Sequence, residues 1–166
     1  TQRLYLIEFF NHYSASIEIL LLIVAMLVML PIRHCGKRIP IYAVAAITAL
    51  TIVFALQPGD STVVSAGEAQ TVITSGNPVF VEFFSNSCTA CLASQPIVKS
   101  LEREIADDVL ILKLNVQDSL ASQLIRDYRA YLTPTFVVIG RDGEVVWRQS
   151  GGLLDKSKAL QALQAA

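Results

Sequence analysis

Two long apolar stretches occupy the first third of the chain. Every residue from Ile19 to Leu30 is apolar, and the stretch extends outward to about residues 15–32. A second stretch without charge runs from Ile39 to Gln57. An α-helix needs about 20 apolar residues to cross about 30 Å of hydrocarbon, and two helices that are apolar on every face are difficult to bury inside a small domain. We therefore predict a membrane anchor over residues 1–57, with transmembrane helices at about 15–32 and 39–57.

The connection between these stretches, residues 33–38, is basic, with Arg33, Lys37 and Arg38. Cytoplasmic loops are enriched in Lys and Arg, so we expect a two-pass inner-membrane protein with everything after Gln57 on the periplasmic or extracytoplasmic side. The first stretch lacks a small-x-small cleavage site and is followed by a second span, so we expect a retained hairpin rather than a signal peptide. We expect residues 1–16 to lie along the bilayer interface or to lengthen the first helix.

Composition agrees with a membrane anchor and excludes some partners. Apolar residues make up 53% of the 166 residues and charged residues 16%, below the roughly 25% charged residues of a typical soluble domain. Beyond residue 58, basic residues are scattered among acidic ones, whereas nucleic-acid-binding proteins gather Lys and Arg on one face. We therefore expect the lipid bilayer and no nucleic acid among the partners.

Residues 58–166 show the alternating pattern of an α/β domain. Buried-type strands are predicted at 78–84, 109–116 and 135–139, and "RDGE" predicts a tight turn into a last strand at 145–150. Helical spacing is seen at 65–75, 89–106, 119–131 and 155–164. Strands that alternate with helices and end in a hairpin imply a mixed sheet with helices on both faces.

The stretch "SNSCTAC" places Cys88 where a predicted strand passes into a helix. Helix N-termini favour anions, so we expect Cys88 to have a lowered thiol pKa and Cys91 to be the shielded, resolving thiol. A c-type haem site needs His after the second cysteine, and Leu92 stands there. A metal site needs further ligands, but both histidines precede the domain. We therefore expect a redox-active disulfide and no metal or other cofactor.

Residues from about 62 to 164 resemble the thioredoxin superfamily, with "VFVEFFSNSCTAC" in the place of its strand and active-site turn. Glu82 matches the buried carboxylate of the family, and Lys113 matches the lysine beside it. Pro96 matches the proline that kinks the active-site helix, and Pro134 in "LTPTF" matches the cis-proline that faces the disulfide.

The resemblance implies an α/β thioredoxin fold and a membrane-anchored, extracytoplasmic thiol-disulfide oxidoreductase. The implied catalytic residues are Cys88, Cys91, Glu82 and Lys113, and the implied substrate-binding residues are Thr133, Pro134, Ser87 and Thr89. Implied partners are protein dithiol or disulfide substrates and a membrane electron carrier, with cytochrome c maturation as one role. The alternative is an accessory or assembly subunit of a membrane complex that uses the fold for docking.

The chain departs from thioredoxin itself around the cysteines. Ser87 stands where thioredoxin has a Trp, and Thr89 and Ala90 replace the Gly-Pro pair. These changes leave the reduction potential open. Strongly oxidising relatives often carry a histidine between the cysteines, and none is present here, which favours a reductant or an exchange protein.

Overall fold

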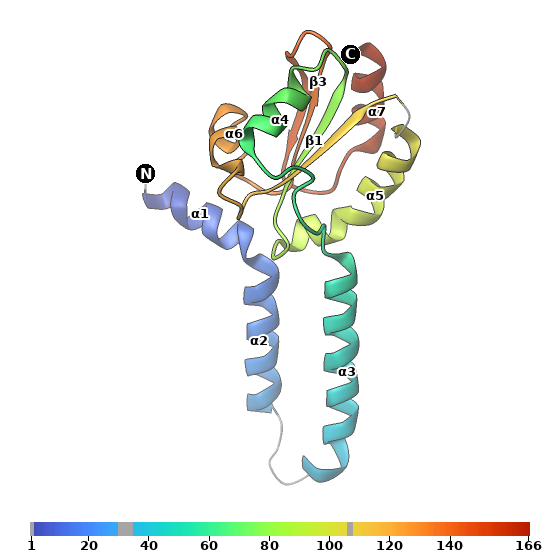
Figure 1. Ribbon diagram of the computed structural model, residues 1–166. Helices are drawn as coiled ribbons and strands as arrows, with labels where there is room; N and C mark the ends of the chain where they lie inside the picture. The colour runs from blue at the N-terminus through green and yellow to red at the C-terminus, as the bar shows by residue number, and fades with distance from the viewer. Residues whose placement is uncertain (1, 30–34, 106–107) are drawn as a thin grey trace.

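Two long helices extend from one end of an α/β domain in the computed structural model, which describes residues 2–29, 35–105 and 108–166 (Figure 1). The helices are α1 (Gln2–His12), α2 (Ser14–Met29), α3 (Cys35–Leu56), α4 (Ala66–Ile73), α5 (Thr89–Ile105), α6 (Ala121–Asp127) and α7 (Lys156–Ala165). The strands are β1 (Val79–Phe84), β2 (Leu110–Asn115), β3 (Thr135–Ile139) and β4 (Val145–Ser150). The domain therefore has the strand and helix order that the sequence predicted.

The two long helices α2 and α3 both extend away from the same end of the domain (Figure 1). Helix α3 begins at Cys35, so residues 35–38 of the predicted loop 33–38 are helical; residues 30–34 lie outside the described residues. Within the described ranges, no single helix is both long and apolar enough to cross a bilayer. The segments Tyr5–His12 and Ser14–Ala25 meet the length and composition requirement only as a pair, bent by 68°.

The N-terminal segment forms a helix of its own. The 68° bend separates α1 from α2 near Tyr13, so α1 does not lengthen α2 as one of our two expectations had it. Instead, α1 lies against the end of the domain from which α2 descends (Figure 1). Its contacts with the domain, described below, place this segment beside the cysteine pair.

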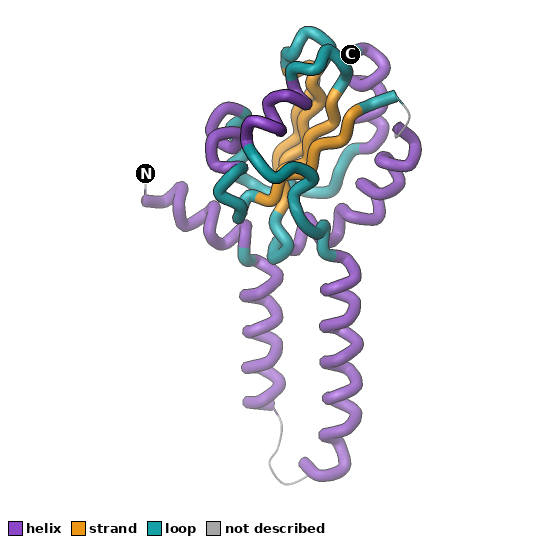
Figure 2. The backbone as a smooth tube through the Cα atoms, in the orientation of Figure 1, coloured by secondary structure: helices purple, strands orange, loops and turns teal. Residues whose placement is uncertain are grey.

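The sheet has four strands in the order β2-β1-β3-β4 (Figure 2). Strand β1 pairs in parallel with β2 and antiparallel with β3, and β3 pairs antiparallel with β4. Every residue of β1 is buried, as expected for a central strand covered by helices on both faces. The predicted mixed sheet is therefore confirmed.

Alternate residues of β1 point into two separate hydrophobic cores, as the pleat of a strand requires. Val79, Val81 and Phe83 pack with residues of α4 and α6 on one face. Phe80 packs with residues of α5 and α7 on the other face. Glu82 has the same parity as Phe80 and Phe84, so the only carboxylate of the strand lies on the α5 face.

Helix α6 is shorter than the predicted helix 119–131. It ends at Asp127 because the backbone turns into the left-handed region at Arg129, where φ is +49°. The Ala130 amide then donates to the Ile125 carbonyl at 2.8 Å, which closes the helix end as in a left-handed C-cap. Arg129 is not a glycine, so the sequence carried no recognisable stop signal here.

Candidate functional site

The cysteine pair lies at the start of α5, directly after the turn that follows β1. The Cys91 backbone amide donates to the Cys88 sulfur at 3.3 Å, and the Cys88 thiol donates to the Thr133 carbonyl at 3.3 Å. Both cysteines are free thiols with no exposed surface, and both pack against Phe84 at the end of β1. The structure thus places Cys88 at a helix N-terminus, as the sequence predicted.

The surroundings separate the pKa values of the two thiols. A hydrogen bond from the Cys91 thiol is the largest influence on the pKa of Cys88. Together with hydrogen bonds to Thr133 and to the first amides of α5, it outweighs the effect of burial and lowers this pKa to about 6. Burial, followed by the interaction with Cys88, raises the pKa of Cys91 well above that of an ordinary thiol. Near neutral pH, Cys88 is therefore the thiolate and Cys91 holds a proton.

Glu82 is fully buried on β1, with Lys113 as its partner on β2 in the parallel register. The Lys113 Nζ lies 3.7 Å from Glu82 Oε2 and 3.2 Å from Glu102 Oε1. Burial raises the pKa of Glu82 to about 7; Lys113 opposes this shift and Glu102 reinforces it. A carboxyl group with this pKa can take up or release a proton at neutral pH.

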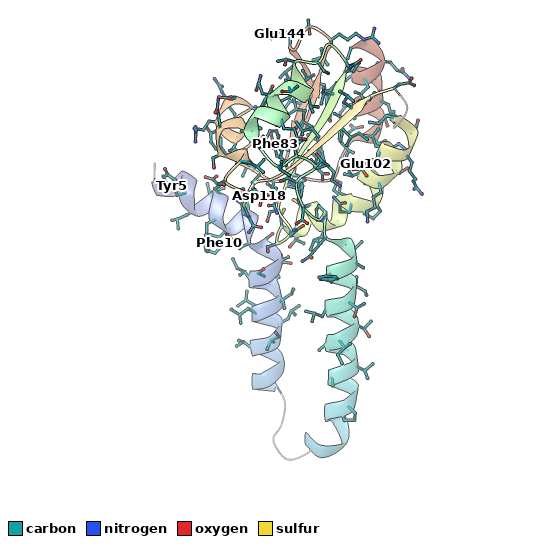
Figure 3. The ribbon with its side chains drawn as sticks, viewed as in Figure 1. Tyr5, Phe10, Phe83, Glu102, Asp118 and Glu144 are labelled. Carbon is teal, nitrogen blue, oxygen red and sulfur yellow. The ribbon has the colours of Figure 1, made fainter. Side chains whose placement is uncertain are left out.

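Two residues of this carboxylate cluster were not anticipated from the sequence. Gln95, also fully buried, donates from Nε2 to Glu82 Oε1 at 3.2 Å. Glu102 lies further along α5 and, like Glu82, contacts the Lys113 ammonium group. Figure 3 labels Glu102 beside the sheet. Gln95 stands directly before Pro96 on a buried face of α5, but the spacing alone did not show which polar group it would meet.

The predicted substrate-binding residues lie around the Cys88 sulfur. The Thr133–Pro134 peptide bond is cis, as the resemblance implied, and the Thr133 carbonyl contacts Cys88 directly. Ser87 and Thr89 flank Cys88 in the turn and the first residue of α5. The structure therefore brings the predicted residues together in one place.

The backbone and side chains of this site already have partners from the N-terminal segment. The side-chain oxygen Oδ1 of Asn11 accepts from the Thr133 N–H at 2.6 Å, and the side-chain nitrogen Nδ2 of Asn11 donates to the Thr133 carbonyl at 2.9 Å. The Ser14 hydroxyl accepts from the Thr89 amide at 2.9 Å, and Glu18 accepts from the Thr89 hydroxyl at 3.1 Å. The sequence pattern did not point to these N-terminal residues, because Asn11 and Thr133 are 122 positions apart along the chain.

Further contacts extend this junction to the turn before Cys88. The Ser85 hydroxyl donates to the His12 carbonyl at 2.8 Å, and the Ala15 amide donates to the Ser87 carbonyl at 2.9 Å. His12 and Ala15 are buried there, and burial lowers the pKa of the His12 imidazole. The N-terminal segment thus contacts residues on both sides of Cys88.

Comparison with known proteins agrees with this geometry. The profile of the Thioredoxin family matches residues 61–165. The chain is 29% identical over 90 residues to thioredoxin X of Arabidopsis thaliana chloroplasts, covering 54% of this chain and 48% of that protein. It is 28% identical over 81 residues to the thiol:disulfide interchange protein TxlA homolog of Synechocystis, covering 49% of this chain and 45% of that protein. The chain thus spans about half the length of each of these two relatives.

Solved structures show the same fold. Fasciola hepatica thioredoxin superposes with a TM-score of 0.51 at 28% identity, covering 61% of this chain and 93% of that one. Mitochondrial thioredoxin 3 of Saccharomyces cerevisiae superposes with a TM-score of 0.53 at 20% identity, covering 63% and 92%. The family match extends over more than half of the chain and includes the cysteine turn, the buried acid and the cis-proline. The chain belongs to the thioredoxin family.

Proposed function

We propose that this protein is a membrane-tethered thiol-disulfide oxidoreductase that exchanges dithiol for disulfide with protein substrates outside the cytoplasm. The observation that carries this proposal is the pair of thiols at the start of α5: Cys88 with a pKa of about 6 and Cys91 with a raised one. This difference makes one sulfur a nucleophile at neutral pH and keeps the other protonated until it is needed.

The reaction consists of two exchanges. The Cys88 thiolate attacks one sulfur of a substrate disulfide; the substrate S–S bond breaks, a mixed disulfide forms, and the leaving thiolate takes up a proton. Cys91 then loses its proton, with the Glu82 carboxylate as the acceptor, and attacks the Cys88 sulfur. The mixed disulfide breaks, the second substrate thiol is released, and Cys88 and Cys91 form a disulfide.

Glu82 suits the second exchange because of its position and its pKa. It lies on the same face of β1 as Phe84, which packs against both cysteines. Its pKa of about 7 lets it accept a proton near neutral pH and return it in the reverse reaction. Lys113, 3.7 Å away, stabilises the carboxylate form once the proton has left.

Tethering to a membrane is supported by where the apolar side chains are exposed. Large apolar side chains lie on the outside of α2 and α3, and each of the following is at least 61% exposed: Leu20, Leu21, Leu22, Val44, Ile47, Leu50 and Phe54. Exposed apolar surface of this extent marks a membrane or protein contact. With the basic segment between the two helices, it favours a hairpin anchor whose domain lies outside the cytoplasm.

Regeneration needs an electron carrier, which we propose to be a membrane protein with its own dithiol or disulfide. Two electrons pass between that carrier and the Cys88–Cys91 disulfide in each cycle. A reductive role in cytochrome c maturation fits this arrangement, because such a role requires reduced thiols on the outer side of the membrane.

The test is reduction of insulin disulfides by the purified full chain in detergent, with dithiothreitol as the electron source. We expect activity that disappears in Cys88→Ser and persists in Cys35→Ser, which lies outside the cysteine pair. In cells, Cys91→Ser should accumulate mixed disulfides with extracytoplasmic proteins. Insulin reduction that persists in Cys88→Ser, or trapping of cytoplasmic proteins alone, would overturn the proposal.

A further inference from the structure

The end of α1 and the first turn of α2 lie against the turn that carries Cys88. We call residues 11–18 the N-terminal corner. Cys88 and Cys91 have no exposed surface, although Cys88 stands directly before the first residue of α5. A thiolate can attack a disulfide of another protein only when the two sulfurs come into contact, so the described conformation does not admit a protein substrate.

The Asn11 side chain occupies the hydrogen-bonding groups that an extended peptide would use. Its amide oxygen accepts from the Thr133 N–H at 2.6 Å, and its amide nitrogen donates to the Thr133 carbonyl at 2.9 Å. The Thr133 hydroxyl also donates to the Asn11 oxygen, at 2.9 Å. Exchange of one N–H and one C=O bond with a single residue is the pattern of a hydrogen-bonded pair between antiparallel strands. Asn11 therefore imitates one residue of a bound strand.

The corner also forms hydrogen bonds with residues on both sides of Cys88. Ser14 accepts from the Thr89 amide at the start of α5. The backbone of the corner exchanges further bonds with Ser85 and Ser87. Within the corner only His12 and Ala15 are buried. Because hydrogen bonds to Thr133 and Thr89 fix the corner in place, another peptide that offers equivalent hydrogen bonds can replace it.

We propose that the N-terminal corner is an intramolecular gate over the substrate-binding edge, and that Asn11 and Ser14 determine which protein disulfides reach Cys88. The substrate it admits is an extended segment that offers an N–H and a C=O to Thr133 beside its disulfide, and that displaces the Asn11 amide as it binds. This inference rests on the proposed function for the identity of the substrate, but the covering of Cys88 is testable without it.

The first measurement is the rate at which iodoacetamide alkylates Cys88 in the reduced full chain, in detergent at pH 8, with Cys35→Ser as the common background. At this pH Cys88 is ionised, since its pKa is about 6, so the rate reports access rather than ionisation. Asn11→Ala removes three hydrogen bonds, and we expect it to raise the rate by about tenfold or more. We expect Ser14→Ala to raise it by several-fold.

The matched control is Ser16→Ala. Ser16 lies in the same corner, is exposed, and makes no side-chain hydrogen bond among the described contacts, so its removal should leave the alkylation rate unchanged. The urea unfolding transition of each variant, followed by the fluorescence of Trp147, shows whether the domain is still folded. If Asn11→Ala does not fold, Ser14→Ala decides the question. Alkylation rates equal to that of the parent in the folded variants would overturn the gate.

Insulin reduction by the same proteins separates the gate from the proposed function. If both hold, Asn11→Ala reduces insulin faster than the parent by a factor similar to that for alkylation. If alkylation rises but no variant reduces insulin, the gate stands and the proposed function fails. If all variants reduce insulin and are alkylated at the rate of the parent, the proposed function stands and the gate fails.

Discussion

The Cys91 thiol is the largest single cause of the low pKa of Cys88, ahead of the hydrogen bonds from Thr133 and from the first amides of α5. The Cys91 backbone amide, which lies 3.3 Å from the Cys88 sulfur, is retained whatever side chain stands at this position. The Cys91 side chain and the backbone amides of the helix N-terminus therefore make separable contributions to the lowered pKa of Cys88.

We predict that Cys91→Ala raises the pKa of Cys88 above its value of about 6, because the thiol donor is lost while the amides remain. Cys91→Ser keeps a donor in the same place and should raise this pKa less. The measurement is the midpoint of the pH dependence of Cys88 alkylation, in a Cys35→Ser background. Equal midpoints for the alanine variant and the parent would contradict the assigned cause.

The buried Glu82 makes the stability of the domain depend on pH. Its pKa is raised from 4.5 to about 7 in the folded chain, so the folded state holds this proton more tightly than the unfolded state. Stability from this group is therefore complete below about pH 4.5 and is lost as the pH rises toward about 7. The shift corresponds to on the order of 3 kcal/mol.

We predict that Glu82→Gln removes this loss, because the amide carries no charge at any of these pH values. The free energy of unfolding of the variant, relative to the parent, should increase by on the order of 3 kcal/mol between about pH 4.5 and 8. Urea unfolding followed by Trp147 fluorescence measures it. Glu104→Gln, whose side chain is 53% exposed, is the control and should show no such trend. A parallel pH profile for Glu82→Gln and the parent would argue against a raised pKa.

Among the helices, α4 has a start that is defined by its own sequence. The Ser65 hydroxyl accepts from the Glu68 amide at 3.1 Å, and the Glu68 carboxylate accepts from the Val64 amide at 2.9 Å. This arrangement is a variant of the capping box, in which the Glu68 carboxylate accepts from the residue before the N-cap instead of from the N-cap Ser65 itself. Because α4 packs through Ala69 and Ile73 on the core shared with β1 and α6, its first turn contributes to the stability of one face of the sheet.

We predict that Ser65→Ala lowers the free energy of unfolding by about 1 kcal/mol, since the Glu68 amide loses its acceptor. Ser65→Asp, which keeps an acceptor at the N-cap, should restore most of this loss. Both are measured by urea unfolding at constant pH. The capping box lies on the opposite face of the sheet from Glu82, so the pH at which Cys88 is half alkylated should not move. A shift of that midpoint would contradict the prediction, because it would show that the N-cap of α4 influences the pKa of Cys88.

The proposed orientation of the chain in a membrane concerns the whole molecule, because the hairpin would set the side on which the domain lies. If the anchor spans the bilayer as proposed, Cys35 lies on the cytoplasmic side and the domain on the other. In a Cys88→Ser, Cys91→Ser background, we predict that a membrane-impermeant maleimide labels Lys158→Cys, at an exposed position on α7, in right-side-out vesicles. Cys35 should be labelled only after the vesicles are opened.

Inverted vesicles provide the control, because the labelling pattern should reverse in them. Labelling of both cysteines from the same side of sealed vesicles would contradict a two-pass anchor while leaving the cysteine pair and its chemistry unaffected. A chain that leaves the membrane fraction at high salt and alkaline pH would contradict insertion altogether.

Much of the fold and the cysteine pair could be predicted from the sequence, because both depend on local pattern. The buried run "VFVEFF" implies a central strand whatever surrounds it, and Cys88 follows from the strand-to-helix junction. Glu82, Lys113 and Pro134 were assigned by resemblance, and the structure pairs Glu82 with Lys113 across neighbouring strands and makes the bond before Pro134 cis.

Other features were decided only by the tertiary structure, because their partners are distant along the chain. Gln95 and Glu102 are ordinary helix residues until α5 packs on the sheet beside Glu82 and Lys113. Asn11 meets Thr133 across 122 residues. Strand and helix periodicity states which face a side chain is on, but a polar side chain can pair with any donor or acceptor that the fold brings to that face. The sequence by itself therefore determined the position of the cysteine pair at the start of a helix. The proposed enclosure of this pair by the N-terminal corner arises only from the packing of α1 against the domain.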